Sequence, residues 1–353
     1  MQGNRTCGIN HRPDKAFLDR LAEVCRIDPP REHGLGTVQT IEAMHRGDIQ
    51  VFVSLGGNFA LATPDPTYTF EALRNCELTV QVSTKLNRSH IVHGRQALIL
   101  PCLARSDKDI QAAGPQGITV EDSMAMVHIS YGMKEPVSPQ LRSECAILAG
   151  LAQATLPGSQ TPWQQYVEDY DRIRDTMAKA LVGFEDFNRR TRRPHGFRLS
   201  QPARERVFAT PSGRGEFSLA PLPDDVDPGR GRLVLTTIRS HDQFNTTIYS
   251  NDDRYRGLKG LRTVVFMNEA DMRDRGLDEF DLIDITSISK DGSRRTAYGY
   301  RAVRFEIPRG CAPGYMPELN ILCGIADYST QSEQPLTKHL VVEITGGHRT
   351  GAG

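Results

Sequence analysis

The sequence has no excess of charge of either sign, because 43 lysine and arginine residues balance 43 aspartate and glutamate residues. Such a balance gives no reason to expect a nucleic acid or an anionic membrane as a partner. The sequence also has no apolar run close to the ~18 residues that a membrane span needs. Its first residues, MQGNRTCGIN, are too polar for a signal peptide. We therefore expect a cytoplasmic protein with no membrane span, unless a partner exports it.

Paired cysteines are missing as well. The seven cysteines are scattered singly, and no two stand at the C-x-x-C spacing of zinc and iron–sulfur sites. The sequence has neither a G-x-S-x-G motif nor the lysine motif of a P-loop. We expect no metal site, no cluster and no disulfide bond within this chain.

Alternating helical and extended patterns occupy the first part of the chain. Helices are expected at 15–26, 38–47 (with Thr37 as its cap) and 67–76, and strands at 49–55, 78–83 and 96–103. This alternation is typical of a doubly wound α/β sheet, in which ligands bind beyond the carboxyl ends of the strands. The run at 49–55 is apolar almost throughout, which predicts a central strand buried on both faces. Two more helices are expected at about 139–155 and 163–181.

The pattern changes after residue 194. Six prolines fall between 194 and 228, which indicates a linker or crossover. From residue 232 the chain becomes rich in short strand-like segments: RLVLTTI, TVVFMN, DLIDITSI, AYGYRAV and KHLVVEI. Only one short helix is expected among them, at 269–276. Strands this short and numerous favour a small β-barrel.

A series of long stretches stands in the chain in an order shared with one enzyme family. The stretches are QGNRTCGI, PPREHGL, TIEAMHRGDIQVFVSLGGNFALATPD, VSTKLNRSHIVHGRQALILPCLARSDKD, TVEDSMAMVH, LVLTTIRSHDQFNTTIYSNDDRYRG, VVFMNEADMRDRGL and YSTQSEQPLTKHLVVEI. They resemble the molybdopterin-dependent oxidoreductases, most closely the branch of formate dehydrogenase-like alpha subunits. The resemblance covers nearly the whole chain and corresponds to the C-terminal half of that family.

The resemblance implies an α/β fold in two parts. The first is the C-terminal part of a doubly wound α/β cofactor-binding domain, at 1–195. A linker at 196–231 leads to a double-psi β-barrel that binds the molybdopterin dinucleotide, at 232–346. A tail follows at 347–353.

The resemblance also implies a cofactor and a reaction. In the family, a molybdenum or tungsten ion is held by the dithiolenes of two molybdopterin guanine dinucleotides. A small substrate such as formate gives two electrons to the metal, and a 4Fe–4S cluster passes them on. The chain has no segment that matches the metal-ligand loop or the cluster region, which stand in the N-terminal part of the family.

We therefore expect a C-terminal portion that contributes cofactor-binding loops and is inactive alone. Its partner would be the missing N-terminal half or a separate catalytic, iron–sulfur polypeptide. The alternative is a non-catalytic cofactor-binding or assembly module, or an inactive fragment, that acts only with such a polypeptide.

Polar residues follow each strand of the predicted sheet. Gly56, Gly57 and Asn58 follow the first strand, where glycine lets a phosphate or a ring approach the backbone. The alternative is a tight turn that Asn58 caps. By resemblance, the residues after the next two strands line the nucleotide: Ser83, Thr84, Lys85, Asn87, Arg105 and Asp107. The alternative for Lys85 is a solvated loop lysine.

The segment after the first barrel strand carries Arg239, Ser240, His241 and Gln243. The permanently charged guanidinium of Arg239 suits a pterin carbonyl or a phosphate. His241 has an ordinary pKa near neutrality and can move a proton; the alternative is that it only holds the loop. No residue is assigned as catalytic, and Arg239 and His241 are expected nearest the chemistry.

Five further residues are expected to contact the cofactor. Asn268 and Asp271 stand where relatives bind guanine, and a carboxylate can accept from the guanine N–H groups. Helix capping is an equal alternative for Asn268. Asn320, Gln334 and Lys338 resemble the loop that closes over the second pterin. Lys338 is expected opposite a pyrophosphate, with an exposed lysine as the alternative.

Overall fold

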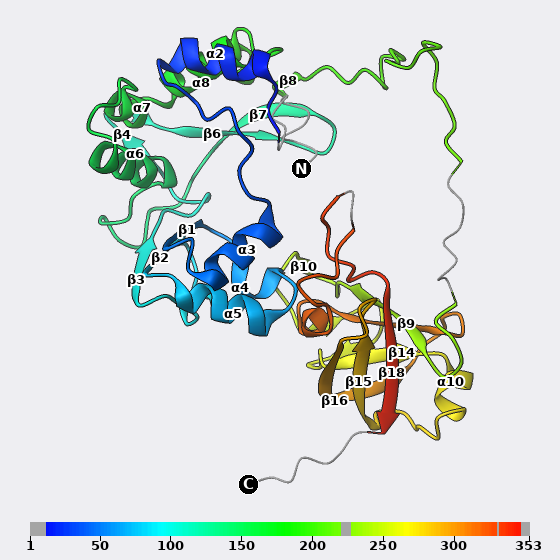
Figure 1. Ribbon diagram of the computed structural model, residues 1–353. Helices are drawn as coiled ribbons and strands as arrows, with labels where there is room; N and C mark the ends of the chain where they lie inside the picture. Colours follow the sequence, from blue (N-terminus) through cyan, green and yellow to red (C-terminus); the bar gives the residue numbers. More distant parts are fainter. Residues whose placement is uncertain (1–11, 220–226, 330–331, 347–353) are drawn as a thin grey trace. The chain divides into compact units, whose positions relative to one another are not determined.

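The computed structural model describes residues 12–219, 227–329 and 332–346. Its contacts divide the chain into two compact units (Figure 1). The first unit consists of residues 1–34 and 101–220, and the second of residues 35–100 and 221–353. Within the described ranges, no helix is both long enough and apolar enough to cross a membrane.

A three-stranded sheet begins the second unit. Its strands, in order, are β1 (Val51–Leu55), β2 (Leu78–Ser83) and β3 (Gln96–Pro101), with β1 and β2 parallel. Helix α3 (Thr37–Arg46) precedes β1, and helices α4 (Phe59–Ala62) and α5 (Pro66–Asn75) lie between β1 and β2. Helix α3 ends because Gly47 takes a left-handed φ of 83°. Helix α5 begins at Asp65, whose carboxylate accepts the N–H of Tyr68.

Helices α3 and α5 pack on one face of this sheet. Ile41, Met44 and Leu73 are fully buried there, with Phe52 of β1 packed against them. The other side of β1 is open, because Val51 and its alternate neighbours stay exposed. The prediction that 49–55 is buried on both faces was therefore wrong: β1 is an edge strand. The described chain does not confirm the doubly wound layer.

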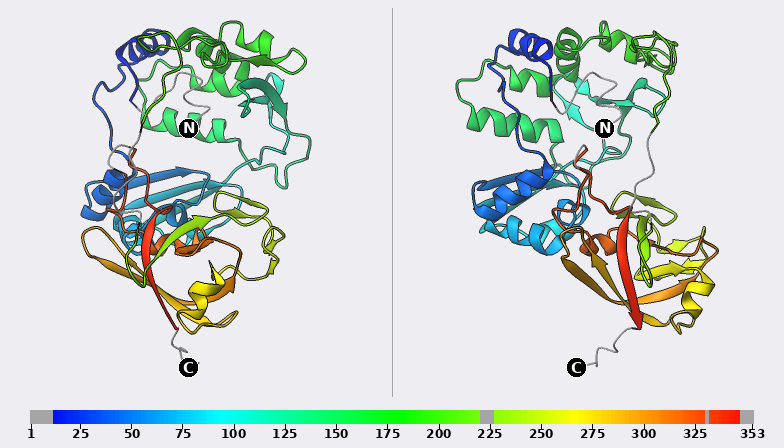
Figure 2. Two further views of the ribbon diagram at one scale, coloured as in Figure 1. Left: turned by 90° about the vertical axis from the view of Figure 1, so that its right-hand side faces the viewer. Right: turned by 45° about the vertical axis from the view of Figure 1, so that its right-hand side comes forward.

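A closed barrel of six strands forms the rest of the second unit (yellow to red in Figure 2). The strands are β9 (Leu233–Ile238), β14 (Val264–Met267), β15 (Leu282–Ile288), β16 (Arg294–Arg304), β17 (Cys311–Tyr315) and β18 (Leu340–Gly346). They close in the order β14-β16-β15-β18-β9-β17. Two parallel pairs, β9 with β17 and β14 with β16, interrupt an otherwise antiparallel wall. The predicted double-psi β-barrel is confirmed.

One barrel strand, β17, has a sequence that does not indicate a strand. Its residues CAPGY include Pro313 and Gly314, which are both rare in strand interiors. Gly314 is required for close packing, because a Cβ atom there would lie 2.8 Å from the carbonyl oxygen of Val264. The strand therefore forms through tertiary pairing with β9 and β14.

Short elements connect the barrel strands. They are β10 (Gln243–Phe244), β11 (Thr247–Ile248), β12 (Asp252–Asp253), β13 (Leu258–Lys259), α10 (Glu269–Arg273) and the 3-10 helix η2 (Glu318–Leu322). Strands β10 and β11 pair with each other, as do β12 and β13. Both hairpins lie between β9 and β14, directly after the segment predicted to bind the cofactor.

Polar contacts join the sheet to the barrel within the second unit. The carboxylate of Asp65 accepts from Arg295 of β16 at 2.9 Å and from the N–H of Ile325 at 3.3 Å. The side-chain amide of Asn320 in η2 donates to the carbonyl of Leu61 at 2.8 Å. Asp65 and Asn320 are both buried, so these bonds are shielded from water.

The first unit is mostly helical. Its helices are α2 (Lys15–Cys25), α6 (Glu144–Thr155), α7 (Trp163–Glu168), α8 (Tyr170–Ala180) and α9 (Phe187–Thr191). Its strands are β4 (Ile110–Gln111), β5 (Gly114–Pro115), β6 (Gly117–Glu121), β7 (Met126–Tyr131) and β8 (Phe197–Arg198). The single helix predicted at 163–181 is broken at Asp169, which is extended and caps α8 through Asp171 N–H.

Candidate functional site

The turn after β1 has a backbone shape that glycine adopts easily. Gly56 and Gly57 have φ angles of 67° and 75°, in the left-handed region. A Cβ atom added at either position would meet no atom within 4 Å, so both glycines border open space. The N–H of Gly56 donates to the carbonyl of Val82 at 2.7 Å, which fixes the turn beside β2. An exposed backbone of this kind is what a phosphate or flat ring needs to approach.

Asn87 connects this turn to the loop after β2. Its side-chain amide donates to the carbonyl of Gly57 at 2.7 Å, and its oxygen accepts the N–H of Ser89 at 2.9 Å. The hydroxyl of Ser89 donates to the side-chain oxygen of Asn58 at 3.3 Å. Asn58 occupies the N-cap position of α4 in this tight turn, as the alternative predicts, but its side chain makes no capping bond. The two predicted loops therefore form one hydrogen-bonded group.

The other candidates in the β2 loop are less constrained. The hydroxyl of Ser83 donates to the carbonyl of Lys85 at 2.8 Å, which tightens the turn. The side chains of Thr84 and Lys85 are exposed. They are free to meet a ligand, but they are equally consistent with a solvated loop.

Two positively charged residues lie near the end of the first barrel strand. Arg239 directly follows β9, and Lys338 precedes β18, which pairs with β9. The ammonium of Lys338 donates to the carbonyl of Thr237, and the carbonyl of Lys338 accepts the hydroxyl of Thr236 at 2.8 Å. Partial burial, and then the positive charge of Arg239, hold the pKa of Lys338 below its ordinary value.

This pair of cations has no internal counter-charge. Within the described ranges, no carboxylate lies at ion-pair distance from Arg239 or Lys338. Two like charges held near each other repel, and an anion between them would relieve that repulsion. A pyrophosphate suits such a place, because its oxygens accept charge-assisted hydrogen bonds from guanidinium and ammonium groups.

The loop that begins at Arg239 is held by a hydrogen-bond network. The amide oxygen of Gln243 accepts from the N–H of Ser240 at 3.0 Å, and its amide nitrogen donates to the carbonyl of Met316 at 2.8 Å. Arg262 donates to the hydroxyl of Ser240 at 2.8 Å and forms a two-point ion pair with Glu318 at 2.5 and 3.0 Å. Ser240 and Gln243 thus shape the loop in this structure.

His241 lies over a buried carboxylate, Asp253. The N–H of His241 donates to Asp253 at 3.2 Å, and the hydroxyl of Tyr315 donates to the same carboxylate at 2.5 Å. Burial alone would raise the pKa of Asp253, but hydrogen bonds from Tyr315 and Arg256 outweigh it and lower the pKa. The His241 ring packs edge-on against Tyr255 and has Arg254 2.8 Å from Nε2. The contacts hold the ring in place beside the Arg239 end of the barrel.

Asn268 and Asp271 lie at the opposite end of the barrel wall. The Asp271 carboxylate accepts from the N–H of Gly310 at 2.7 Å and from Arg309 at 3.2 Å. Gly310 directly precedes β17, which runs parallel to β9, so this end corresponds to the start of β9. At about 3.3 Å per residue, the six residues of β9 separate the two ends by roughly 20 Å. Asn268 caps α10 through the N–H of Ala270 at 2.9 Å, as its alternative role predicts.

The remaining candidates are spread over both units. Asn320 is buried and used in the bond to Leu61, whereas Gln334 is exposed. Arg105 and Asp107 belong to the first unit, where Asp107 accepts the N–H of Ala104 at 2.9 Å and Arg105 is exposed. Among the described residues, no group of three or more His, Cys, Asp and Glu side chains is arranged to hold a metal ion.

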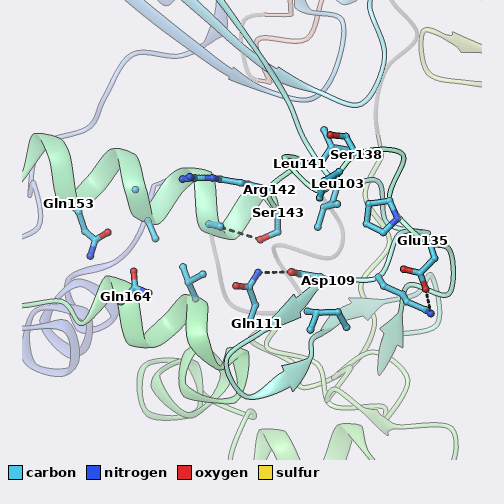
Figure 3. A pocket seen from close by; sticks show the side chains of 18 residues that line it. Leu103, Asp109, Gln111, Glu135, Ser138, Leu141, Arg142, Ser143, Gln153 and Gln164 are labelled. Atoms are coloured by element: carbon cyan, nitrogen blue, oxygen red, sulfur yellow. Dashed lines mark hydrogen bonds and ion pairs between the residues drawn. The ribbon is translucent and has the colours of Figure 1, made fainter.

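A cavity of about 600 Å³ lies in the first unit (Figure 3). Its polar side contains Asp109, which accepts from Gln111 at 2.5 Å and from the hydroxyl of Tyr170 at 2.5 Å. Ser143 shares a hydrogen bond of 2.6 Å with the same Tyr170 hydroxyl. Burial, and then the bond to Asp109, raise the pKa of Tyr170. The polar groups already satisfy one another, and none of the predicted site residues lines this cavity.

Two supporting residues, Arg262 and Asp253, were missed in the sequence. Each stands alone in an ordinary loop segment, LRT or NDDRY, and no spacing distinguishes it from a surface charge. Their importance arises from burial: the Asp253 side chain is 3% exposed and that of Arg262 is 12% exposed. The only available signal was that Asp253 stands inside a stretch that resembles the family and that Arg262 lies between two such stretches.

Comparison with known proteins supports the cofactor class. Residues 233–339 match the family model described as the molydopterin dinucleotide binding domain. The whole chain also resembles the acetylene hydratase of Pelobacter acetylenicus in fold. That likeness has a TM-score of 0.57 at 12% identity, over 94% of this chain and 50% of that one. At this identity it shows the fold alone.

Two groups of sequence relatives match nearly the entire chain. A protein of Mycobacterium tuberculosis named an uncharacterized oxidoreductase is 47% identical over 98% of this chain. The protein YdeP of Escherichia coli is 40% identical over 98% of it. The chain spans only 45% and 46% of the lengths of these relatives. Residues 233–339 thus match a molydopterin dinucleotide binding domain, in a chain that is similar to part of a protein named an oxidoreductase.

Proposed function

We propose that this chain is the part of a molybdenum or tungsten bis(molybdopterin guanine dinucleotide) oxidoreductase, formate dehydrogenase-like, that supplies cofactor-binding loops. One observation carries the proposal. Arg239 and Lys338 are neighbouring cations with no carboxylate at ion-pair distance among the described residues, and they lie at one end of a barrel that matches a dinucleotide-binding domain. An anionic dinucleotide would supply the missing negative charge.

The residues present fit such a cofactor. Arg239 and Lys338 would bind a pyrophosphate, while the open backbone of Gly56 and Gly57 would admit a second phosphate or a ring edge. The bound cofactor supplies two-electron redox chemistry, and the protein supplies binding and orientation. Ser240 and Gln243 would position the loop, and His241 would hold or move a proton near the pterin.

Guanine recognition is the role proposed for Asn268 and Asp271, whereas Asn320 is proposed to belong to the loop that closes over the second pterin. The roughly 20 Å between the Asp271 and Arg239 ends of the barrel suits an elongated dinucleotide better than a compact ligand. Asp271 would exchange its bond to Arg309 for the N–H groups of the base, while keeping the N–H of Gly310. Arg105, Asp107, Ser83, Thr84, Lys85, Asn87 and Gln334 remain proposed contacts of the same cofactor.

Cofactor content tests this proposal directly. The chain is purified from a molybdenum-replete host, denatured with acid, and assayed for guanine nucleotide and metal. We expect near-stoichiometric guanine nucleotide in the wild type and at least a tenfold loss in the variant Arg239→Ala/Lys338→Ala. Arg294→Ala, which removes another exposed barrel cation, should retain the nucleotide. A folded wild-type chain with no nucleotide would contradict the proposal that these loops suffice for binding.

Catalysis by the chain alone is not expected. The metal ligand and the iron–sulfur cluster are proposed to come from the rest of the enzyme, as a missing N-terminal half or a separate polypeptide. Formate-dependent reduction of an artificial dye by the purified chain should therefore be absent. Turnover above the rate of a boiled sample would show that the chain does not need the rest of the enzyme for catalysis, and would contradict this proposal.

A further inference from the structure

The cavity in the first unit has room for a small molecule (Figure 3). Its volume of about 600 Å³ lies in the range of roughly 300–1,000 Å³ that is usual for ligand sites. Its walls come from α6, α7 and the segments 103–111 and 135–143. Aliphatic side chains from several of these segments form part of the wall: Leu103, Leu141, Ala146, Ala149 and Val167.

Four charged residues line the cavity, and three of them are already used. Lys108 and Glu135 form an ion pair, and the carboxylate of Asp109 accepts from the hydroxyl of Tyr170 at 2.5 Å. Within the described ranges, the guanidinium of Arg142 has neither an ion pair nor a hydrogen-bond partner. A guanidinium presents a planar fork of donors that matches a carboxylate, so Arg142 is suited to bind one.

The charge balance of the wall limits the charge of the ligand. The positive charges of Lys108 and Arg142 equal the negative charges of Asp109 and Glu135. The carboxylate of Asp109 would repel a second negative charge brought into the same cavity. A carboxylate, with one charge, therefore fits better than a phosphate with two.

Two carboxamides form another part of the wall. Gln153 of α6 and Gln164 of α7 point toward each other (Figure 3). The amide nitrogen of Gln164 donates to Glu168 at 3.2 Å, which leaves its oxygen available, and Gln153 has no side-chain partner in the described part of the chain. Carboxamides both donate and accept hydrogen bonds, so this part suits an uncharged hydroxyl or carbonyl group.

The spacing of these groups sets the length of the ligand. Gln153 follows Arg142 by eleven residues, which is roughly 16 Å along a helix axis at 1.5 Å per residue. The two long side chains each cover part of this span. A ligand that contacts both therefore needs a short carbon chain between its polar ends, and the aliphatic wall suits such a chain.

Gly150 keeps this part of the cavity wide. It lies inside α6, where glycine is less favourable than alanine. A Cβ atom there would meet no atom within 4 Å, so packing does not require glycine. Gly150 lines the cavity, and a large side chain at this position would take up the space of a ligand.

We propose that this cavity binds a small aliphatic carboxylate that carries a hydroxyl or carbonyl group at its other end. Arg142 binds the carboxylate, and Gln153 and Gln164 bind the far group. None of the residues predicted to bind the cofactor lines the cavity, so this site does not depend on the proposed function.

Calorimetric titration of the purified chain tests the ligand class with four related probes. They are 4-hydroxybutyrate, butyrate, which lacks the hydroxyl, 1,4-butanediol, which lacks the carboxylate, and inorganic phosphate. We expect 4-hydroxybutyrate to bind most tightly. Loss of the charge-assisted bond should make 1,4-butanediol weaker by about tenfold or more, and loss of a neutral bond should make butyrate weaker by about threefold. Phosphate that binds as tightly as 4-hydroxybutyrate, or no binding to the folded chain, would overturn the proposal.

Variants then assign the residues. Arg142→Gln should weaken 4-hydroxybutyrate by about tenfold, whereas Arg204→Gln, an exposed arginine of the same unit outside the cavity wall, should leave it unchanged. Gln153→Leu/Gln164→Leu should bring the affinity for 4-hydroxybutyrate down to that for butyrate.

Gly150→Leu should fill the cavity and prevent binding. Leucine is a better helix former than glycine, so thermal unfolding should show an intact fold. Unchanged binding by Gly150→Leu or by Arg142→Gln would show that the probe binds elsewhere, and would contradict the assignment of this cavity.

Discussion

The barrel and the three-stranded sheet differ in how far they bury their apolar side chains. In the barrel, the inward side chains of all six strands meet one another, and Leu235, Val265 and Ile285 are fully buried. Closure also removes sheet edges, so no strand depends on a further layer. The sheet has two edges; its central strand β2 is buried, but valines of the edge strand β1 remain in contact with water. The comparison shows that apolar composition produces a core only where topology supplies an opposite wall.

Truncation of an aliphatic side chain should give the largest difference in stability between the barrel and the sheet. Ile285→Ala in the barrel is expected to lower the free energy of unfolding by about 4 kcal/mol, because it leaves a cavity in a closed core. Val53→Ala in the sheet should change it by less than about 0.5 kcal/mol, because the side chain is already solvated. Urea denaturation measures both. Equal losses at the two positions would mean that the sheet face is covered in the free chain.

Removal of Arg262, which holds the loop that begins at Arg239, should cause the next largest loss of stability. Arg262→Ala leaves the partly buried Glu318 without its partner and frees the hydroxyl of Ser240. We expect a loss of about 3 kcal/mol, as for other ion pairs shielded from water. Arg262→Lys should recover only part of it, because an ammonium cannot form the two-point bond. If Arg262→Lys had the full stability of the wild type, the positive charge alone, and not the two-point bond, would account for the effect.

The buried carboxylate of Asp253 makes barrel stability depend on pH. Its pKa is lowered on folding, so its contribution is present above the unfolded value of about 3.9 and disappears as pH falls through the folded value. Asp253→Asn should therefore cost about 2 kcal/mol at pH 7 and much less at pH 3. Thermal unfolding at both pH values measures the difference. Equal losses at the two pH values would contradict this expectation.

The smallest expected effect concerns the turn after β1. Gly56→Ala should cost about 1 kcal/mol, solely because its φ of 67° is unfavourable for a residue with a Cβ atom. Gly150→Ala is the matched control: it also meets no neighbour, but it lies inside α6, where alanine should stabilise by about 0.5–1 kcal/mol. Opposite signs in calorimetry would confirm that backbone geometry, and not space, selects Gly56.

Several parts of the fold were readable in advance because they are local. The strands at 78–83 and 282–288, and the end of α3 at Gly47, follow from apolar runs and turn chemistry. The strand β17 was not readable, because Pro313 and Gly314 form a strand only when β9 and β14 pair with them. The break at Asp169 was missed since the flanking helical patterns continue on both sides.

The candidate site shows the same division. The sequence alone determined which residue types are available, including two glycines after a strand, an arginine after another, and a lysine 99 positions later. The proposed roles of these residues stay predictions. Only tertiary structure decided that Arg239 lies near Lys338 with no carboxylate at ion-pair distance in the described ranges, that Asp271 lies at the other end of the barrel, and that Val53 is exposed. Local propensity acts over a few residues, whereas burial and electrostatic pairing depend on which distant segments the folded chain brings together.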